Sequence, residues 1–428
     1  MNIEELYKIY SEHSSVKTDT RSIEEGDIFF ALKGPNFNGN AFAQQAIKKG
    51  AAFAVIDEGI YTIPGKTYLV EDSLNALQAL AKHHRRQFTI PFIAITGSNG
   101  KTTTKELVHA VLSSQYKTYT TEGNLNNHIG VPLTILKIKK DAEFAIIEMG
   151  ANHQGEIASY CTIALPTYGL ITNCGKAHLE GFGGIEGVRK GKGELFQFLR
   201  LYNGGAFVMW DYEYLKKMSK GIQTIFKYGT ANAELTGNIN GHDTLLQVQF
   251  DTGFNEPIST QLVGNYNLPN VLAAVAIGKF FHVPDEKIKA AIEDYSPSNS
   301  RSQLIEKGSN KIILDAYNAN PSSMKLAIEN LSKQRSENKI LVIGAMAELG
   351  VESLQEHQSI IEEINKHSWK NVLLVGGDFC KIEHPYLKLN SSEEANQWLK
   401  ENKIRDSLIL VKGSRSMKME KVMEYLQQ

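Results

Sequence analysis

Cysteine is scarce in this chain of 428 residues, which contains Cys161, Cys174 and Cys380 alone. Three isolated and widely spaced cysteines exclude a disulfide framework and do not match the ligand spacing of a zinc site. Long apolar runs are also lacking, and none approaches the length that a bilayer span needs. The first ten residues, MNIEELYKIY, are acidic and amphipathic, unlike a signal peptide. We therefore expect a cytoplasmic protein that does not bind a membrane.

An excess of charge of either sign is missing as well, because the formal net charge is -1. This balance gives no electrostatic reason to expect nucleic acid as a partner. Apolar residues make up 42% of the chain and charged residues 22%, which is typical of a globular protein. A chain of this length exceeds one ordinary hydrophobic core, so we expect two or three domains.

A strand, a glycine-rich turn and a helix are predicted in succession from Pro91 to Glu106, PFIAITGSNGKTTTKE. The apolar run before the turn indicates a buried strand, and the periodicity from Lys105 to Leu112 indicates a helix. Gly97 and Gly100 allow backbone N–H groups to approach an anion closely, and the helix N-terminus adds its partial positive charge. The segment is therefore suited to bind phosphate.

Two side chains strengthen this interpretation. Lys101 supplies a mobile cation, and the Thr102 hydroxyl can bind Mg²⁺, which together predict nucleoside triphosphate binding. The common GxxxxGK[ST] spacing is only partly matched, because Ile95 stands where the first glycine belongs. The alternative is a glycine-rich turn with a surface lysine. The residues expected to contact ATP here are Thr96, Gly97, Ser98, Asn99, Gly100, Lys101, Thr102 and Thr103.

Residues 1–90 alternate predicted strands and helices, which indicates a small α/β domain. Before the segment GDIFFALKG, which predicts a strand from Gly26 to Gly34, the polar residues Asp19, Thr20 and Arg21 follow one another. Such a cluster can hold a polar ligand, and the alternative is a charged turn.

Residues 91–300 form a second unit in which two polar side chains follow predicted strands. Glu148 ends the apolar segment EFAIIEMGAN, and His178 lies just beyond the strand TYGLITN. The carboxyl ends of parallel strands are where ligands bind, so Glu148 is placed to be a second Mg²⁺ ligand. The alternative for Glu148 is a solvent-exposed strand end. For His178 we expect a metal ligand or a stabiliser of charge.

Other polar residues of this unit admit two interpretations each. Asn126 and Asn127, in EGNLNNHIGVPLTIL, either bind a ligand or form a structural turn. Lys192, in RKGKGELF, by itself indicates a basic surface turn. Asn267 and Asn270 open an alanine-rich helix and either read an adenine edge or cap that helix.

Residues 301–428 repeat the alternation of strands and helices, with strands KIILDAY, KILVIGA, NVLLVGG and SLILVKG and helices beginning near Ser322, Ser353, Ser391 and Met417. This pattern predicts a second doubly wound sheet. Loops after its strands should face the nucleotide-binding unit. Polar residues in these loops are Asp315, Tyr317, Asn318, Lys412, Ser414 and Arg415.

Eight motifs in order now identify a resemblance: TGSNGKTTTKE, GNLNNHIGVPLT, EMGAN, AHLEGFG, KGELF, NxxN before AA, DAYNANPSSM and AMAELG. They resemble the Mur ligase superfamily, whose phosphate loop has the shortened TGxxGKT form. Within it, YNANPSSM and AELG are similar to the members that join D-alanyl-D-alanine to UDP-N-acetylmuramoyl-tripeptide. These two motifs differ from those of the enzymes that add earlier stem-peptide residues and of folylpolyglutamate synthases.

The resemblance implies an α/β protein of three domains. It implies a UDP-substrate domain (1–90), a central P-loop ATPase domain with a parallel sheet (91–300) and a C-terminal Rossmann-like domain for the dipeptide (301–428). It also implies ATP and Mg²⁺ as cofactors, small-molecule substrates, an acyl phosphate intermediate and release of ADP. We expect a monomer. The rivals are another Mur-type or folylpolyglutamate-type amide ligase and a non-catalytic P-loop nucleotide-binding protein.

The resemblance also implies roles for individual residues, including a CO₂ carbamate on Lys192 that supports a second Mg²⁺. Catalytic roles fall to Lys101, Glu148, His178, Lys192 and Arg301. Metal binding falls to Thr102, Glu148, His178 and Lys192. Nucleotide binding beyond the phosphate loop falls to Asn270, Arg301 and Asp315. Expected substrate contacts are Asp19, Thr20, Arg21, Ser22, Asn126, Asn127, Asn318, Asn320 and Ser322.

Some positions depart from the family pattern. Asn38 and Asn40 stand where aspartate and histidine are expected, in FNGN instead of FDGH. Tyr266 replaces a histidine beside the adenine-binding asparagine, and Ala316 and Ala345 occupy places that are commonly polar or acidic. These departures affect the expected UDP-side contacts and leave the ATP site intact.

Overall fold

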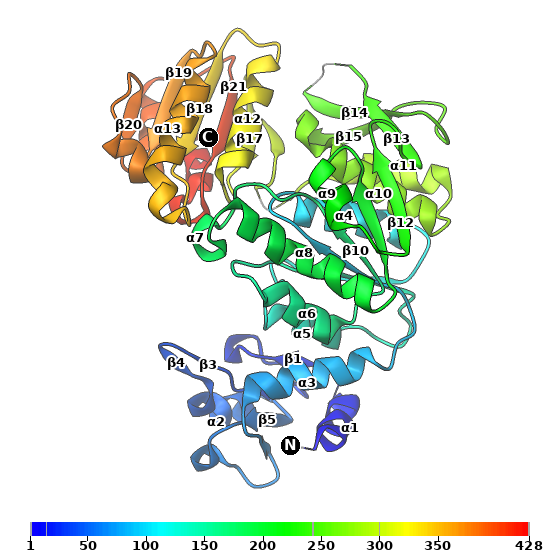
Figure 1. Cartoon of the computed structure of the whole chain (residues 1–428). Helices are drawn as coiled ribbons and strands as arrows, with labels where there is room; N and C mark the ends of the chain where they lie inside the picture. Colours follow the sequence, from blue (N-terminus) through cyan, green and yellow to red (C-terminus); the bar gives the residue numbers. More distant parts are fainter. Residues whose placement is uncertain (1, 14, 242–243, 299, 427–428) are drawn as a thin grey trace.

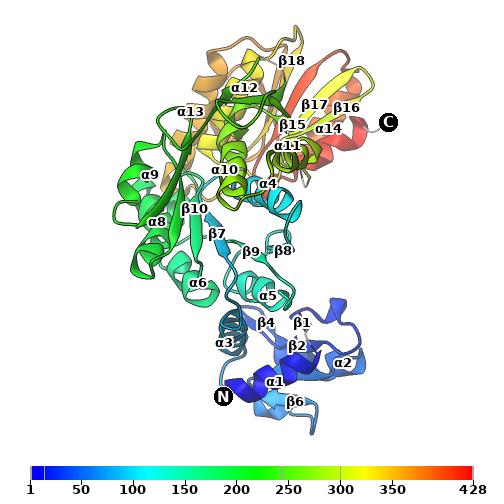
Figure 2. The same cartoon turned by 90° about the vertical axis from the view of Figure 1, so that its right-hand side faces the viewer.

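The computed structural model describes residues 2–13, 15–241, 244–298 and 300–426. It contains a four-stranded, a nine-stranded and a six-stranded sheet, one after another along the chain, and a small hairpin. Parallel strands predominate and alternate with helices, so the expected α/β fold with three units is confirmed. In both views the N-terminal unit lies at one end of the molecule and the C-terminal unit at the other (Figures 1 and 2). The exact domain limits stay predictions.

The N-terminal unit has a parallel sheet of order β1-β2-β5-β6, next to the hairpin β3-β4. The strand expected from Gly26 to Gly34 is divided in two, because the chain leaves the sheet after Phe30 and Pro35 turns it into the hairpin. The strands are β1 (Val16–Lys17), β2 (Ile28–Phe30), β3 (Lys33–Gly34), β4 (Phe37–Asn38), β5 (Phe53–Ile56) and β6 (Thr67–Leu69). The helices are α1 (Ile3–His13), α2 (Ala43–Lys48) and α3 (Ser73–Arg85).

The central unit is built on the sheet β15-β14-β13-β12-β11-β10-β7-β9-β8. Its strands run parallel from β8 to β13, and β14 and β15 add an antiparallel edge. We did not expect β8, β13 or β15, whose sequences are short or polar. The strands are β7 (Phe92–Thr96), β8 (Thr118–Thr120), β9 (Phe144–Glu148), β10 (Tyr168–Ile171), β11 (Gly205–Met209), β12 (Thr224–Gly229), β13 (Leu235–Ile239), β14 (Leu245–Phe250) and β15 (Ile258–Val263).

Helices cover both faces of this sheet. Helices α4, α10 and α11 pack together on one face, and α5, α6 and α8 pack on the other, where α3 of the N-terminal unit joins α5 and α6 (Figure 2). Helix α4 begins at the lysine of the phosphate loop, four residues earlier than expected. The helices are α4 (Lys101–Ser113), α5 (Gly130–Leu136), α6 (Glu156–Ala164), α7 (Leu179–Phe182), α8 (Ile185–Leu201), α9 (Glu213–Met218), α10 (Leu268–Phe280) and α11 (Asp285–Asp294).

The C-terminal unit has the sheet β16-β17-β21-β18-β19-β20, in which β16 is antiparallel and the other strands are parallel. The expected helix near Met417 is wrong, because short 3-10 turns occupy residues 415–422 and α15 (Met423–Leu426) follows them. The strands are β16 (Gln303–Lys307), β17 (Asn310–Asp315), β18 (Lys339–Gly344), β19 (Asn371–Val375), β20 (Leu387–Leu389) and β21 (Leu408–Lys412). The helices are α12 (Pro321–Lys333), α13 (Ser353–Asn365) and α14 (Ser392–Glu401).

The apolar strands explain this arrangement. Strands β7, β9, β11 and β21 are buried along their whole length, as expected for parallel strands with helices on both faces. At the carboxyl ends of these strands, the chain therefore leaves the buried core and enters loops that carry hydrogen-bonding groups. Across the described residues, we find no helix with the length and apolarity needed to span a membrane.

Candidate active site

A cleft of about 1040 Å³ lies where the central and C-terminal units meet. It is lined by loops that follow β7, β9 and β10 on one side and β17, β18 and β21 on the other. The structure thus brings together residues that are far apart in the sequence. The expected site residues in its lining are Ser98, Asn99, Gly100, Lys101, Thr102, Thr103, Asn126, Asn127, Glu148, His178, Asn270, Arg301, Asp315, Asn318, Asn320 and Ser322.

Other expected residues lie outside this lining. Thr96 and Gly97 belong to the end of β7 and the first turn of the loop, and Lys192 is buried inside α8. The segment from Asp19 to Ser22 belongs to the N-terminal unit, where Arg21 forms an exposed ion pair with Asp19 at 2.6 Å. Hydrogen bonds from Arg21 lower the pKa of Asp19 to about 2. This pair is fully ionised at neutral pH.

The phosphate loop requires glycine at two positions. Gly97 has φ +145°, and a Cβ there would lie 2.0 Å from Thr172 Oγ1. Gly100 has φ +78°, and a Cβ there would lie 2.6 Å from Asn270 Oδ1. A side chain at either position would meet both an unfavourable backbone conformation and a neighbouring atom. The loop is also anchored to the segment that follows β10, because Ser98 N donates to Asn173 O at 2.9 Å.

Lys101 folds back over this loop. Its Nζ donates to Gly97 O at 2.7 Å and to Ser98 O at 3.2 Å. Burial lowers the pKa of Lys101, the carboxylate of Glu148 opposes this change, and the charge of Arg301 adds to it. The two carbonyl groups therefore hold the Lys101 ammonium beside the N–H groups of the loop. A cation that binds phosphate must lie at this place.

Glu148 has one carboxylate oxygen without a partner. Its Oε1 accepts from Thr102 Oγ1 at 3.2 Å and from Asn126 Nδ2 at 2.7 Å. Its Oε2 is buried and has no hydrogen-bond partner among the described residues. The side chain is 1% exposed, so the interpretation as a solvent-exposed strand end is wrong. A buried carboxylate oxygen without a donor favours a cation beside it.

These groups fit Mg²⁺ better than a metal held by protein alone. No group of three His, Cys, Asp or Glu side chains suited to a metal occurs within the described ranges of the chain. Thr102 and Glu148 instead offer a hydroxyl and a carboxylate beside the phosphate loop. Mg²⁺ commonly takes one or two such ligands and completes its shell with water and substrate phosphate.

His178 faces the C-terminal unit. It has φ 52° and stands immediately before α7. Its Nδ1 lies 2.5 Å from Glu348 Oε2, an ion pair when the imidazole is protonated. The hydrogen bond with His178 lowers the pKa of Glu348. This pair joins the loop after β10 to the loop after β18. The role of His178 as a metal ligand or charge stabiliser stays a prediction.

Lys192 is buried in the middle of α8 and is 1% exposed. Its Nζ donates to Ala151 O at 3.0 Å and lies 5.0 Å from the centre of the Phe182 ring. Burial, followed by the charge of Lys101, lowers the pKa of Lys192 to about 7. The interpretation as a basic surface turn is wrong, because the whole segment is helical and this side chain points into the core.

Asn270 connects two helices rather than capping one. Its Nδ2 donates to Asn267 Oδ1 at 2.8 Å, and its Oδ1 accepts from Thr104 Oγ1 at 3.0 Å. Asn267 in turn donates to Val263 O at 2.8 Å and makes no side-chain cap bond. The capping alternative is therefore wrong for Asn267, and Asn270 supports the helix that follows the phosphate loop. Adenine contact by Asn270 stays a prediction.

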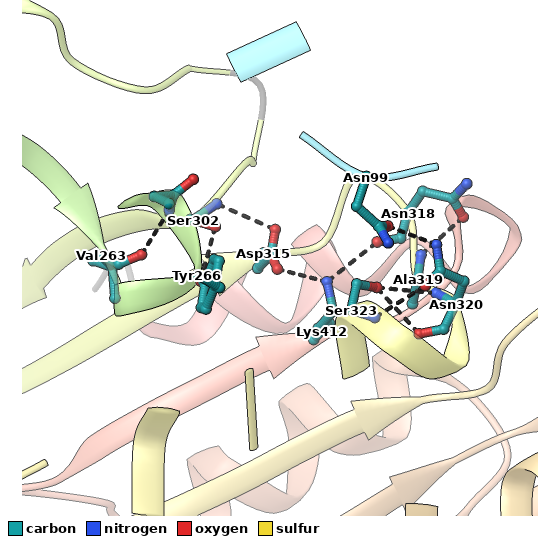
Figure 3. Close-up of polar contacts among 11 residues, drawn as sticks. Asn99, Val263, Tyr266, Ser302, Asp315, Asn318, Ala319, Asn320, Ser323 and Lys412 are labelled. Carbon is teal, nitrogen blue, oxygen red and sulfur yellow. Dashed lines mark hydrogen bonds and ion pairs between the residues drawn. The ribbon is translucent and has the colours of Figure 1, made fainter. Parts of the chain in front are cut away.

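A polar chain crosses from the central unit into the C-terminal unit (Figure 3). Tyr266 Oη lies 3.0 Å from Ser302 Oγ, and Ser302 N donates to Asp315 Oδ1 at 3.2 Å. Lys412 Nζ donates to Asp315 Oδ2 at 2.5 Å, and Lys412 as a residue is 2% exposed. Burial raises the pKa of Tyr266. The tyrosine that departs from the family pattern thus tethers Asp315 through Ser302.

Further contacts attach the phosphate loop directly to α12. Asn320 Nδ2 donates to Asn99 Oδ1 at 2.7 Å, as Figure 3 shows, and Lys176 N donates to Ser322 Oγ at 3.0 Å. Lys176 also forms an ion pair with Glu356 of α13. Asn320 and Ser322 were expected to contact substrate, and in this structure they contact the central unit.

Several residues that join the two units were not among the expected site residues. The sequence contained an indication of two of them, because Lys176 lies two positions before His178, and Glu348 lies in the motif AMAELG after β18. What the sequence could not supply was the pairing across the cleft. The residues are Lys176, Glu348 and Glu356.

The remaining departures have structural explanations. Asn40 is fully buried and exchanges hydrogen bonds with Asp57, at 2.7 Å from its Nδ2 to Asp57 Oδ1 and at 2.9 Å from Asp57 N to its Oδ1. Asn38 accepts from Asn40 N at 3.0 Å. Ala316 and Ala345 are buried at 0% and 4% exposure, respectively, where small apolar side chains suffice.

Comparison with known proteins agrees with this geometry. Three family models match in succession: "Mur ligase family, catalytic domain" over residues 12–85, "Mur ligase middle domain" over 95–278, and "Mur ligase, glutamate ligase domain" over 300–415. The UDP-N-acetylmuramoyl-tripeptide--D-alanyl-D-alanine ligase of Bacillus subtilis (strain 168) is 34% identical over 425 residues, covering 96% of this chain and 92% of that protein. The ligase of the same name from Escherichia coli (strain K12) is 36% identical over 429 residues, covering 97% and 94%.

Solved structures give the same result. MurF from Acinetobacter baumannii superposes with a TM-score of 0.87 at 30% identity, covering 97% of this chain and 93% of that one. MurF ligase from Thermotoga maritima in complex with ADP superposes with a TM-score of 0.85 at 27% identity, covering 96% and 97%. The chain therefore belongs to the Mur ligase family, in the group of the UDP-N-acetylmuramoyl-tripeptide--D-alanyl-D-alanine ligases.

Proposed function

We propose that this protein is an ATP-dependent ligase that joins D-alanyl-D-alanine to UDP-N-acetylmuramoyl-tripeptide, a step of peptidoglycan precursor synthesis. The observation that carries the proposal is the similarity to ligases of this name over nearly the whole chain. The cleft supports it, because a phosphate loop, a partly unpaired carboxylate and the loops of a second α/β unit meet there.

The phosphate loop is the proposed ATP site. One structural neighbour, the Thermotoga maritima ligase, was solved in complex with ADP. In this chain the loop presents N–H groups at the start of α4, and Lys101 lies over it. Lys101 and Arg301 neutralise phosphate charge in this proposal. The nucleotide contacts are Thr96, Gly97, Ser98, Asn99, Gly100, Lys101, Thr102, Thr103, Asn270, Arg301 and Asp315.

Mg²⁺ is the proposed metal, held by the Thr102 hydroxyl and the Glu148 carboxylate. Bound there, it would neutralise phosphate charge. The unpaired Oε2 of Glu148 supports this assignment. For Lys192 we propose the CO₂ carbamate that the resemblance implies, because the side chain is buried and its pKa is lowered to about 7, which favours the neutral amine that reacts with CO₂. His178 is proposed to act as a metal ligand or a stabiliser of charge at the same edge of the sheet.

The proposed reaction has two steps. In the first step a carboxylate oxygen of the tripeptide attacks the γ-phosphorus of ATP, and the bond from this phosphorus to the β-phosphate oxygen breaks. The products are ADP and an acyl phosphate on the tripeptide. The amine of the dipeptide then attacks the acyl carbon, loses a proton and expels phosphate, which leaves an amide. Both steps concentrate negative charge near Lys101 and Arg301, where fixed cations stabilise it. Contacts across the cleft help to exclude water, which would hydrolyse the intermediate.

The UDP substrate is proposed to bind at the N-terminal unit. Asp19, Thr20, Arg21 and Ser22 expose polar groups there, and Asn126 and Asn127 line the cleft on the side of that unit. The tripeptide would then extend from this end of the molecule toward the phosphate loop. Asn318, Asn320 and Ser322 line the opposite wall and are proposed contacts for the acceptor.

Release of ADP tests the function. We expect the purified protein to hydrolyse ATP stoichiometrically with amide formation when UDP-N-acetylmuramoyl-tripeptide and D-alanyl-D-alanine are both present. Omission of the dipeptide should abolish amide formation. Single amino acids and L-alanyl-L-alanine serve as matched acceptors, and a preference for one of them would favour another amide ligase. Tight ATP binding without turnover under every condition would favour a nucleotide-binding protein instead.

A further inference from the structure

Two guanidinium groups lie close to the ring of Tyr317 at the wall of the cleft. Arg301 Cζ is 3.5 Å from the centre of this ring, and Arg415 Cζ is 5.8 Å from it. All three residues line the cleft. An aromatic face attracts and orients a guanidinium, so the ring fixes the relative position of two cations. The two arginines are nevertheless placed differently.

Arg301 belongs to the phosphate end of the cleft. Its charge acts on Lys101, whose pKa it helps to lower. Its Nε is buried and has no hydrogen-bond partner within the described part of the chain. A buried donor without an acceptor beside a phosphate loop is suited to a phosphate oxygen. This assignment leaves Arg415 as the second cation of the pair.

Arg415 is the most exposed of the lysines and arginines that line the cleft. Lys412 is buried and paired with Asp315, and Lys101 donates to the carbonyl groups of its own loop. Arg415 follows the end of β21, and its side chain is 65% exposed. Its partner is Glu420, at 3.3 Å through a single nitrogen. The other guanidinium N–H groups therefore remain available to a planar anion.

We propose that Arg415 binds the C-terminal carboxylate of the dipeptide acceptor. This inference rests on the proposed function, which requires the acceptor amine to reach the acyl phosphate beside Lys101 and Arg301. An extended dipeptide spans about 7 Å. Arg301 and Arg415 both lie beside the Tyr317 ring, so an acceptor whose amine reacts near Arg301 can place its carboxylate near Arg415. A guanidinium can bind a carboxylate with two parallel hydrogen bonds, which a lysine cannot do.

This contact explains why the acceptor should be a dipeptide. A single amino acid has its carboxylate on the same carbon as its amine, so it cannot reach Arg415 while its amine reacts. A dipeptide with a blocked C-terminus keeps its length but loses the charge. Arg415 would therefore select both the length and the free carboxylate of the acceptor.

The test combines enzyme variants with two acceptors. Arg415→Ala should raise the KM for D-alanyl-D-alanine about 10- to 100-fold, the loss expected for one charge-assisted contact, and Arg415→Lys should recover part of it. The KM values for ATP and for the UDP substrate should change less than about 2-fold. With D-alanyl-D-alaninamide, whose carboxylate is replaced by an amide, the wild type should lose the same factor. Arg415→Ala should no longer distinguish the two acceptors.

Arg405→Ala is the matched control, because Arg405 is exposed before the amino end of β21 and Arg415 follows its carboxyl end. It should leave all three KM values unchanged. The inference is overturned if Arg415→Ala keeps the wild-type KM for the dipeptide, if the KM for ATP rises instead, or if the variant still discriminates against the amide. A wild-type protein that ligates no dipeptide would overturn the proposed function together with this inference.

Discussion

The phosphate loop and the middle of helix α8 each hold a lysine with a lowered pKa, but they hold it in different ways. Lys101 has two carbonyl partners in its own loop, and the carboxylate of Glu148 is close enough to oppose the change in its pKa. Lys192 has one carbonyl partner, Ala151 O, and lies over the Phe182 ring. The first environment suits a permanent cation that meets phosphate. The second suits an amine that becomes neutral and can react.

Removal of the Lys101 charge should have the largest effect. We expect Lys101→Ala to lower kcat by about 10³-fold, because a fixed cation that meets developing phosphate charge acts most strongly in a closed site. The free energy of unfolding should change by about 1 kcal/mol or less, since Lys101 is partly exposed and donates only to carbonyl groups of its own turn. Steady-state kinetics and urea unfolding measure the two effects. Near-normal turnover would contradict the phosphate-loop assignment.

Replacement of Lys192 should have the next largest effect. We expect Lys192→Ala to lower kcat about 10²-fold, because it removes the group proposed to carry the carbamate. Millimolar bicarbonate should not restore activity, whereas a short carboxylic acid should restore part of it by occupying the space. Lys190→Ala, an exposed lysine on the same helix, is the control and should behave as wild type. Wild-type activity of Lys192→Ala in CO₂-depleted buffer would contradict both the carbamate and its role.

Asn270 tests how the phosphate loop is supported. Asn270→Ala removes the acceptor of Thr104 and the donor to Asn267, both of them buried bonds. We expect the free energy of unfolding to fall by about 1–3 kcal/mol, because buried polar partners are left unpaired. The KM for ATP should rise about 10-fold, and the KM for the dipeptide should rise less. An unchanged ATP affinity, measured by calorimetry, would limit Asn270 to a structural role.

The sequence predicted the parts of the fold that depend on local patterns. Apolar runs followed by glycine, as in the strand before Gly97, located the buried parallel strands. Strands β13 and β15 of the antiparallel edge were not expected, because glycine and polar side chains interrupt the apolar residues of their sequences, LTGNI and ISTQLV. Helix α4 was expected to begin too late, since three threonines in succession have low helix propensity. Gly100 and the contact of Thr104 with Asn270 override that preference.

The candidate site shows the same limit more clearly. The phosphate loop could be found because its glycines and lysine are close in the sequence, and Glu148 because it ends an apolar strand. Lys192 could not be placed, because nothing near it in the sequence indicates that α8 turns this side chain inward. Pairs such as His178 with Glu348 depend on how two sheets face each other. Such pairs become visible only when the structure brings the strand ends together.

The smallest expected effect concerns the hydrogen bond by which the C-terminal unit holds the phosphate loop. Asn320 does two things: it caps α12 through Ser323 N, and its Nδ2 donates to Asn99 Oδ1. Asn320→Ser should keep the cap, because serine is a favourable N-cap residue, but its side chain is too short to reach Asn99. We expect kcat to fall about 3- to 10-fold, the value of one neutral hydrogen bond, with no loss of stability.

Asn320→Ala completes this comparison, because it removes both the cap and the bond to Asn99. It should match Asn320→Ser in kcat and lower the free energy of unfolding by about 1 kcal/mol more. If Asn320 also contacts the acceptor, as proposed above, both variants should in addition raise the KM for D-alanyl-D-alanine. Measurement of kcat and of each KM therefore separates a bond that holds the loop in place from one that binds the dipeptide. Wild-type values of all of them in Asn320→Ser would show that the loop keeps its shape without help from the C-terminal unit.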